Sequence, residues 1–151
     1  MTVKQNSYWR SEISLFERTL KFEKNFGRVR LLLAKAYANE GRFQEAVAED
    51  FKALAIMWGY TQKVKNSQIE EFYLGYIKEI HFHLGSCFAV LGNSELSLKH
   101  YKKALDLEPD SEVIHSAVGL AYIKMRDIPK AITHFEKVVE SCGNTPVVIA
   151  G

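Results

Sequence analysis

A period of 34 residues organises most of this chain and constrains its fold more than any other feature. Gly85 and Gly119 lie 34 positions apart, and the residues around them recur at the same distance. The other recurring pairs are Phe88 with Tyr122, Ser97 with Ala131, Tyr101 with Phe135, and Ala104 with Val138. Self-similarity over so many positions is typical of a stacked repeat, in which each unit buries its apolar face against its neighbours.

A third copy lies upstream, offset from the second by 51 residues, which is one period plus 17. Its matching residues are Ala34, Tyr37, Gly41, Ala46, Ala53 and Leu54, which recur as Gly85, Phe88, Gly92, Ser97, Ala104 and Leu105. We therefore expect one domain over 1–151 with repeats at 27–60, 78–111 and 112–145. An insertion at 61–77 separates the first two repeats.

The pattern within each copy is what two packed antiparallel helices need. A small residue and an aromatic three positions later mark the first helix, and a second small residue and a second aromatic mark the second. Between them, Gly41 and Gly92 can adopt the positive φ of a helix-ending turn. Two positions depart from the pattern: Asp50 replaces the second aromatic in copy one, and Arg126 replaces the turn glycine in copy three.

These residues resemble the tetratricopeptide repeat family, whose period is 34 residues. The resemblance implies an all-α fold, a right-handed superhelix of antiparallel helix pairs with about seven helices. In that superhelix the first helix of each pair lines the concave face, where such proteins usually bind their partners. Arg30, His81 and His115 depart from the family pattern, because each replaces a large apolar residue early in its copy.

Apolar periodicity extends beyond the repeats. An orphan helix at 8–25 is expected to cap the first repeat, and the remaining helices are expected at 28–40, 43–57, 69–91, 94–107, 111–125 and 128–141. The helix at 69–91 begins about two turns early, after a loop at 59–67. Residues 146–151 are either the start of a truncated repeat or a tail.

Composition excludes several function classes. The formal net charge is +2, which gives no general attraction to nucleic acid or to an anionic membrane. No run reaches 18 apolar residues, and the first ten residues lack the apolar segment of a signal peptide. We expect no nucleic-acid partner and no direct membrane contact from these residues.

No catalytic, cofactor or metal site is predicted. The chain has no nucleophile-elbow motif and no glycine-rich phosphate loop. His83 and Cys87 are four residues apart on one helix, but two ligands without a visible third make a weak metal site. Cys87 is predicted to be a small buried residue. The histidines are predicted to lie at the surface or in the groove, and the chain is predicted not to be an enzyme.

The resemblance implies a concave groove built from the first helix of each copy. The expected groove positions are Arg28, Leu31, Lys35, Ala38, Asn39, Glu79, Phe82, Ser86, Ala89, Val90, Val113, Ser116, Leu120, Ile123 and Lys124. Most groove positions are apolar or small, which favours an apolar peptide or helix as ligand. A second candidate surface is formed by Phe72, Tyr73 and Tyr76, which either cover the insertion loop or contact a partner.

Two functions follow from these features. The first is a non-catalytic protein-protein interaction module that binds a peptide or helix of an unidentified partner in the groove. The alternative is the soluble regulatory or substrate-presenting tail of a membrane glycosyltransferase-like protein, which the segment from Trp9 to Leu20 resembles. Self-association is a further alternative. Localisation is unknown from these residues: cytoplasmic by default, and extracytoplasmic if the chain is such a tail.

Overall fold

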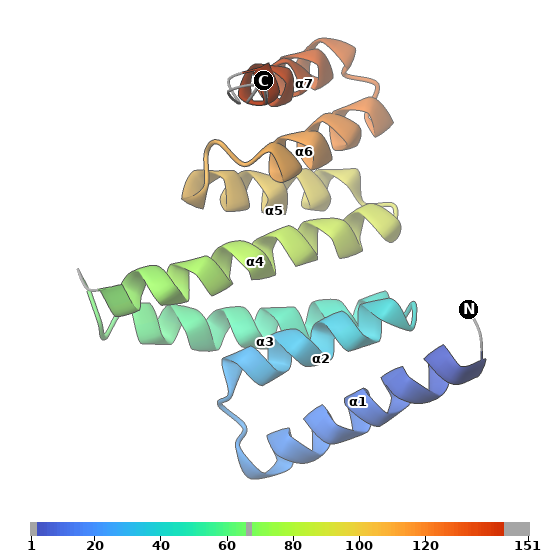
Figure 1. Cartoon of the computed structure of the whole chain (residues 1–151), viewed down its shortest axis with the longest axis vertical. Coiled ribbons are helices and arrows are strands. Elements are labelled where there is room, and N and C mark those ends of the chain that lie inside the picture. Colours follow the sequence, from blue (N-terminus) through green and yellow to red (C-terminus); the bar gives the residue numbers. More distant parts are fainter. Residues whose placement is uncertain (1–2, 66–67, 144–151) are drawn as a thin grey trace, which may run out of the picture.

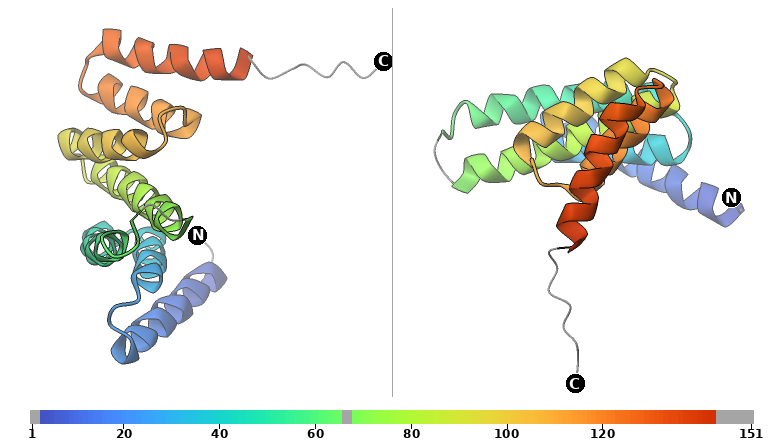
Figure 2. Two further views of the ribbon diagram at one scale, coloured as in Figure 1. Left: turned by 90° about the vertical axis from the view of Figure 1, so that its left-hand side faces the viewer. Right: turned by 90° about the horizontal axis from the view of Figure 1, so that it is seen from above.

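Seven α-helices stack along one axis in the computed structural model, which describes residues 3–65 and 68–143 (Figure 1). No strand occurs among these described residues. The helices are α1 Val3–Phe22, α2 Gly27–Asn39, α3 Phe43–Thr61, α4 Gln68–Val90, α5 Ser94–Leu107, α6 Glu112–Lys124 and α7 Ile128–Gly143. Each helix packs mainly on its neighbours in the sequence. The predicted all-α fold is confirmed as a helical-repeat solenoid (Figure 2).

The same turn joins the two helices of every copy. Gly41, Gly92 and Arg126 all have positive φ, at 79°, 80° and 61°. The backbone N–H of the next residue then donates to the carbonyl of the aromatic in the first helix. These bonds run from Arg42 to Tyr37 (2.9 Å), from Asn93 to Phe88 (2.9 Å) and from Asp127 to Tyr122 (3.0 Å). The repeated turn fixes where the first helix ends in all three copies.

Small residues allow the two helices of a copy to approach closely. A Cβ added at Gly85 would lie 2.5 Å from the Tyr101 ring, and one at Gly119 would lie 2.7 Å from the Phe135 ring. Both distances are shorter than ordinary side-chain contacts, so a side chain at either glycine would force the ring of the second helix to shift. The equivalent residue in copy one is Ala34, and in that copy Asp50 takes the place of the aromatic.

Helix α1 covers the first full repeat. Ile13 and Leu20 are buried in the same cluster as Val29, Leu33 and Tyr37. The Tyr37 hydroxyl also donates to Glu17 Oε1 at 2.6 Å. The helix begins and ends earlier than the predicted 8–25, at Val3 and Phe22.

The insertion lengthens two helices rather than one. Helix α3 continues to Thr61, although the sequence predicted its end near residue 57 and a loop from 59. Helix α4 begins at Gln68, close to the prediction, so α3 and α4 extend together as one long hairpin (Figures 1 and 2). Tyr60 and Tyr73 stack across it, with ring centroids 5.1 Å apart. The expected loop is therefore shorter than predicted, because Tyr60 packs against α4 and Thr61 is buried.

No helix within the described residues is both long and apolar enough to span a bilayer. The predicted repeat start or tail at 146–151 lies outside the described residues.

Candidate functional site

The first helices of the three copies, α2, α4 and α6, are linked to one another at the predicted groove positions. Lys35 on α2 forms an ion pair with Glu79 on α4. The Lys124 ammonium on α6 donates to the carbonyl of Ala89 on α4 at 3.3 Å. These contacts join residues 44 and 35 positions apart, so the groove positions of neighbouring copies lie side by side.

Four large apolar side chains at predicted groove positions are exposed to solvent. Val90 is 61% exposed, Val113 65%, Leu120 57% and Ile123 45%. All four occupy groove positions of the repeat. A folded core normally buries such side chains, so these four residues add exposed apolar surface to α4 and α6.

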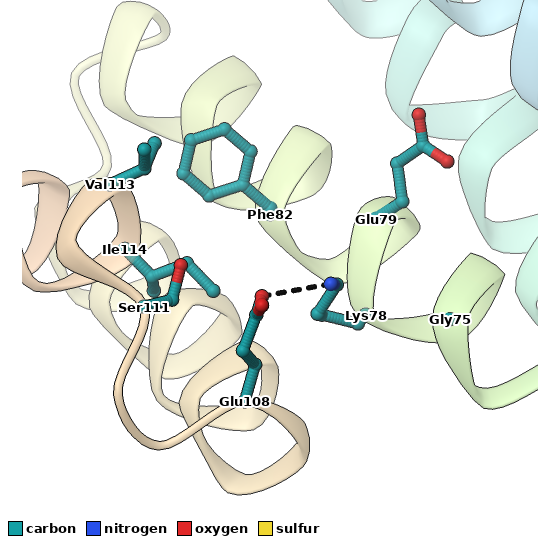
Figure 3. Close-up of a pocket in the computed structure, with 8 residues that line it drawn as sticks. All are labelled: Gly75, Lys78, Glu79, Phe82, Glu108, Ser111, Val113 and Ile114. Carbon is teal, nitrogen blue, oxygen red and sulfur yellow. Dashed lines mark ion pairs between the residues drawn. The ribbon is translucent and has the colours of Figure 1, made fainter. Parts of the chain in front are cut away.

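A pocket of about 300 Å³ opens between α4 and the start of α6 (Figure 3). The Phe82 ring points toward Val113, and Ile114 and Ser111 lie beside them. The ion pair between Lys78 Nζ and Glu108 Oε2, at 2.8 Å, crosses the pocket from α4 to the residue after α5. An apolar wall with one charged edge suits a side chain that is mostly apolar.

A second pocket, of about 330 Å³, lies between the end of α4, α5 and α6. Leu120 and Lys124 line it together with Ala89, Ala117 and Tyr101. The predicted groove residues Glu79 and Phe82 therefore line one pocket, and Leu120 and Lys124 line the other.

Leu31 does not face the groove, contrary to the prediction. It is 2% exposed and belongs to the buried cluster of Ala53, Met57, Ile77, Ile80 and Leu84. Ile77 lies in the part of α4 that precedes the second repeat, so the lengthened helix contributes to the cluster that covers Leu31. The prediction failed because the family's position does not show that Leu31 joins a buried cluster with side chains of α3 and α4.

The remaining predicted groove residues vary in exposure. Arg28 and Asn39 are exposed, and Ser116 is half-buried. Ser86 is also half-buried, because its hydroxyl donates to the Phe82 carbonyl and accepts from the Tyr101 hydroxyl.

The second candidate surface forms a chain of aromatic rings at the start of α4. Phe72 is 57% exposed and makes edge contacts with Tyr73 and Tyr76, at centroid distances of 5.6 Å and 5.0 Å. Tyr73 and Tyr76 are half-buried and pack against the α2–α3–α4 core. Packing against α3 thus occupies much of this surface, and Phe72 remains the exposed member.

The prediction that the histidines lie at the surface or in the groove is wrong for His81, His100 and His115, which are buried. They form two pairs, 34 residues apart. The Nδ1 atoms of His81 and His100 are 3.0 Å apart, and those of His115 and His134 are 2.9 Å apart. Periodicity within one helix could not reveal these pairs, because each joins two helices of a copy.

Copy one has an ion pair at the same place. Arg30 and Glu49 precede His81 and His100 by 51 positions, and Arg30 Nη1 lies 2.6 Å from Glu49 Oε2. Each copy therefore connects its two helices with one buried or half-buried polar pair. In copy three the tautomers follow from the geometry. His115 Nε2 lies 2.8 Å from the Pro109 carbonyl and must donate to it. In a neutral pair His115 Nδ1 then accepts from His134 Nδ1–H.

Only one group of described side chains has ligand atoms close enough to share a metal ion: Asp50, His83 and Cys87. Cys87 is buried, as predicted. The third member, Asp50, was missed because it lies on α3, 33 positions before His83.

Comparison with known proteins supports the repeat. The sequence model of the tetratricopeptide repeat matches residues 78–111, the same bounds that the internal period predicts for the second copy. A mutant of the protein MamA has a similar structure, with a TM-score of 0.60 and 23% identity, over 85% of this chain and 81% of that one. At this identity the likeness establishes the fold only. YrrB, described as a TPR protein with an unusual peptide-binding site, matches with a TM-score of 0.43 and 14% identity, over 95% and 82% of the two chains.

One curated relative matches by sequence. The UDP-N-acetylglucosamine–peptide N-acetylglucosaminyltransferase of Giardia intestinalis is 34% identical over 74 residues, which is 46% of this chain. The match spans 5% of that enzyme's length.

Proposed function

Because this chain is a protein of tetratricopeptide repeats, we propose that it is a non-catalytic interaction module that binds a peptide or helix of a partner protein in its concave face. The binding surface consists of the inner walls of α2, α4 and α6. Repeats of this kind stack into extended concave surfaces that are used for binding.

The observation that carries the proposal is the exposure of four apolar side chains, Val90, Val113, Leu120 and Ile123. Val113 lines the first pocket, and Leu120 and Ile123 line the second. A helical ligand places apolar side chains at intervals of three and four residues, and these would enter the pockets. Lys124 lines the second pocket, so an acidic group on the ligand is favoured at that end.

Selection from a random peptide library tests the proposal without a known partner. We expect the chain to enrich peptides with apolar residues at helical spacing. Leu120→Arg should weaken their binding at least tenfold, because a charge would enter an apolar pocket. Val139→Arg is the matched control, since Val139 is 69% exposed on α7 and lies outside both groove pockets. If the selected peptides bind Leu120→Arg as tightly as Val139→Arg, the groove is not the binding surface.

A second candidate function is supported by the match to the peptide N-acetylglucosaminyltransferase. In this alternative the chain is the regulatory or substrate-presenting repeat region of a glycosyltransferase-like membrane protein. Sequencing the full transcript tests it. An encoded transmembrane segment of about 20 apolar residues together with a transferase domain is the expected result. A complete reading frame without either would refute this alternative and leave the first proposal intact.

A further inference from the structure

Three side chains that often bind metals meet between α3 and α4. Asp50 on α3 is fully buried, and His83 and Cys87 lie one turn apart on α4. His83 Nδ1 is 2.6 Å from Asp50 Oδ2, and His83 Nε2 is 3.9 Å from Cys87 Sγ. The imidazole therefore has the carboxylate at one nitrogen and the thiol at the other.

The internal repeat shows what this location normally holds. Asp50 occupies the position of Tyr101 and Phe135 in the other copies. His83 and Cys87 occupy the positions of Ala117 and Ala121 one copy later, and these alanines line a pocket together with Tyr101. A large aromatic beside two alanines has thus been exchanged for a small carboxylate beside a histidine and a cysteine. The exchange replaces apolar packing with three polar groups at the same place in the fold.

The polar groups are not fully satisfied by one another. Asp50 Oδ1 is buried and has no hydrogen-bond partner within the described part of the chain. Burial raises the pKa of the Asp50 carboxyl, although its hydrogen bond to His83 acts in the opposite direction. Burial alone would lower the pKa of His83, but the hydrogen bonds to Asp50 and Cys87 and the negative charges of both groups together outweigh burial and raise this pKa to about 9. An unpaired buried carboxylate oxygen costs stability unless another group binds it.

We propose that Asp50, His83 and Cys87 form a binding site for a divalent cation of the zinc class. A thiolate and an imidazole together suit zinc, whereas calcium and magnesium prefer oxygen ligands alone. One ligand atom from each residue lies within 4.8 Å of the others. Ligands held about 2.0–2.3 Å from zinc in a tetrahedron are roughly 3.3–3.7 Å apart, so small side-chain rotations close the site.

Binding replaces protons with the ion. The proton of the Cys87 thiol and the proton shared by His83 and Asp50 are released to solvent, because the ligand atoms must be deprotonated. Three protein ligands leave the fourth position of a tetrahedral ion for water. His83, with a side chain 16% exposed, is the only one of the three that is open to solvent, so the ion enters past its ring.

Cobalt and zinc titration of the purified, chelator-treated chain tests the site. We expect one equivalent of Co²⁺ to give the thiolate-to-metal charge-transfer absorption, and one equivalent of Zn²⁺ to displace it and raise the melting temperature. Cys87→Ser should abolish the charge-transfer band, and Asp50→Asn should raise the Kd for zinc at least tenfold. Cys142→Ser is the matched control, because it removes the other cysteine of the chain and should leave both signals unchanged.

Helical circular dichroism shows whether each variant folds, and Asp50→Asn preserves the shape of the side chain if Cys87→Ser does not fold. Absence of a saturable thiolate–cobalt signal in the wild-type chain would overturn the proposal. So would binding that Asp50→Asn leaves unchanged. In either case the three residues are a metal-free polar cluster. Peptide binding in the groove is measured separately, so the outcome does not depend on the proposed function.

Discussion

At the scale of single residues, the contact between a glycine and an aromatic ring holds each of the last two copies together. Gly119 packs beneath Phe135, and Gly85 packs beneath Tyr101. The internal period marked these glycines as packing residues rather than turn residues. Sequence alone could not show that the partner ring is the aromatic 16 positions later, because helical periodicity describes one helix and not its contacts.

Gly119→Ala should therefore destabilise the chain. The added Cβ would lie 2.7 Å from Phe135 Cζ, and overpacking of this kind costs about 1–3 kcal/mol. Gly75→Ala is the matched control, because nothing lies within 4 Å of a Cβ at that helical position. Replacing an exposed helical glycine with alanine should stabilise by about 0.5–1 kcal/mol. Urea unfolding of both variants measures the difference, and equal free energies of unfolding would disprove the packing role of Gly119.

The buried histidine pair of copy two makes stability depend on pH. Burial lowers the pKa of His81 and of His100 to about 4, and the Lys103 charge acts in the same direction. In the unfolded chain both have the ordinary value of about 6.5. Between these values the unfolded chain binds more protons, so the contribution is complete above pH 6.5 and is lost as the pH falls toward 4.

We expect the free energy of unfolding to fall by at least about 1.4 kcal/mol between pH 6.5 and pH 4.5, the equivalent of one pKa unit. His83 contributes in the opposite direction and in another window, because its raised pKa of about 9 makes its contribution decline only as pH rises above 6.5. Replacing both His81 and His100 with leucine should flatten the acid dependence. An unchanged slope in that double variant would assign the effect to other groups.

At the scale of elements, the repeated turn explains why the first helix of each copy ends at the same position of the repeat. The turn needs a residue with positive φ, and copy three uses Arg126 at 61° where the others use glycine. The sequence predicted the departure at residue 126. It could not predict that the backbone keeps the left-handed conformation despite the arginine.

Arg126→Gly should therefore stabilise the chain by about 1 kcal/mol, since non-glycine residues pay roughly 1–2 kcal/mol for a left-handed conformation. Thermal unfolding measures the change. Gly92→Ala, at φ 80°, is the reverse test and should destabilise by a similar amount. A lower melting temperature for Arg126→Gly would mean that the arginine side chain makes a stabilising contact that outweighs the strain.

The α3–α4 hairpin shows where prediction from the sequence stops. Apolar spacing from Ile69 onward correctly indicated that α4 begins early. The lengthening of α3 was missed because Gly59 and the polar residues after it are typical of a loop. Contacts from α4 keep that segment helical: Tyr60 stacks on Tyr73, and Thr61 is 2% exposed. Tertiary packing of this kind is invisible to local sequence patterns.

At the scale of the whole molecule, stacking of helix pairs turns separate residues into one surface. Glu79, Phe82, Leu120 and Lys124, which the family pattern placed in the groove, line two pockets. The burial of Leu31, the histidine pairs and the Asp50–His83–Cys87 cluster could not be anticipated, because each depends on contacts between different helices. Self-association stays a prediction, to be tested by light scattering across concentration.

The most direct test of the central claim is to map a selected peptide onto the chain by NMR. If the concave face binds, amide shifts should change on α2, α4 and α6, with the largest changes near Val90, Val113 and Leu120. Shifts confined to the outer helices α3, α5 and α7, or to the aromatic rings around Phe72, would contradict binding in the groove.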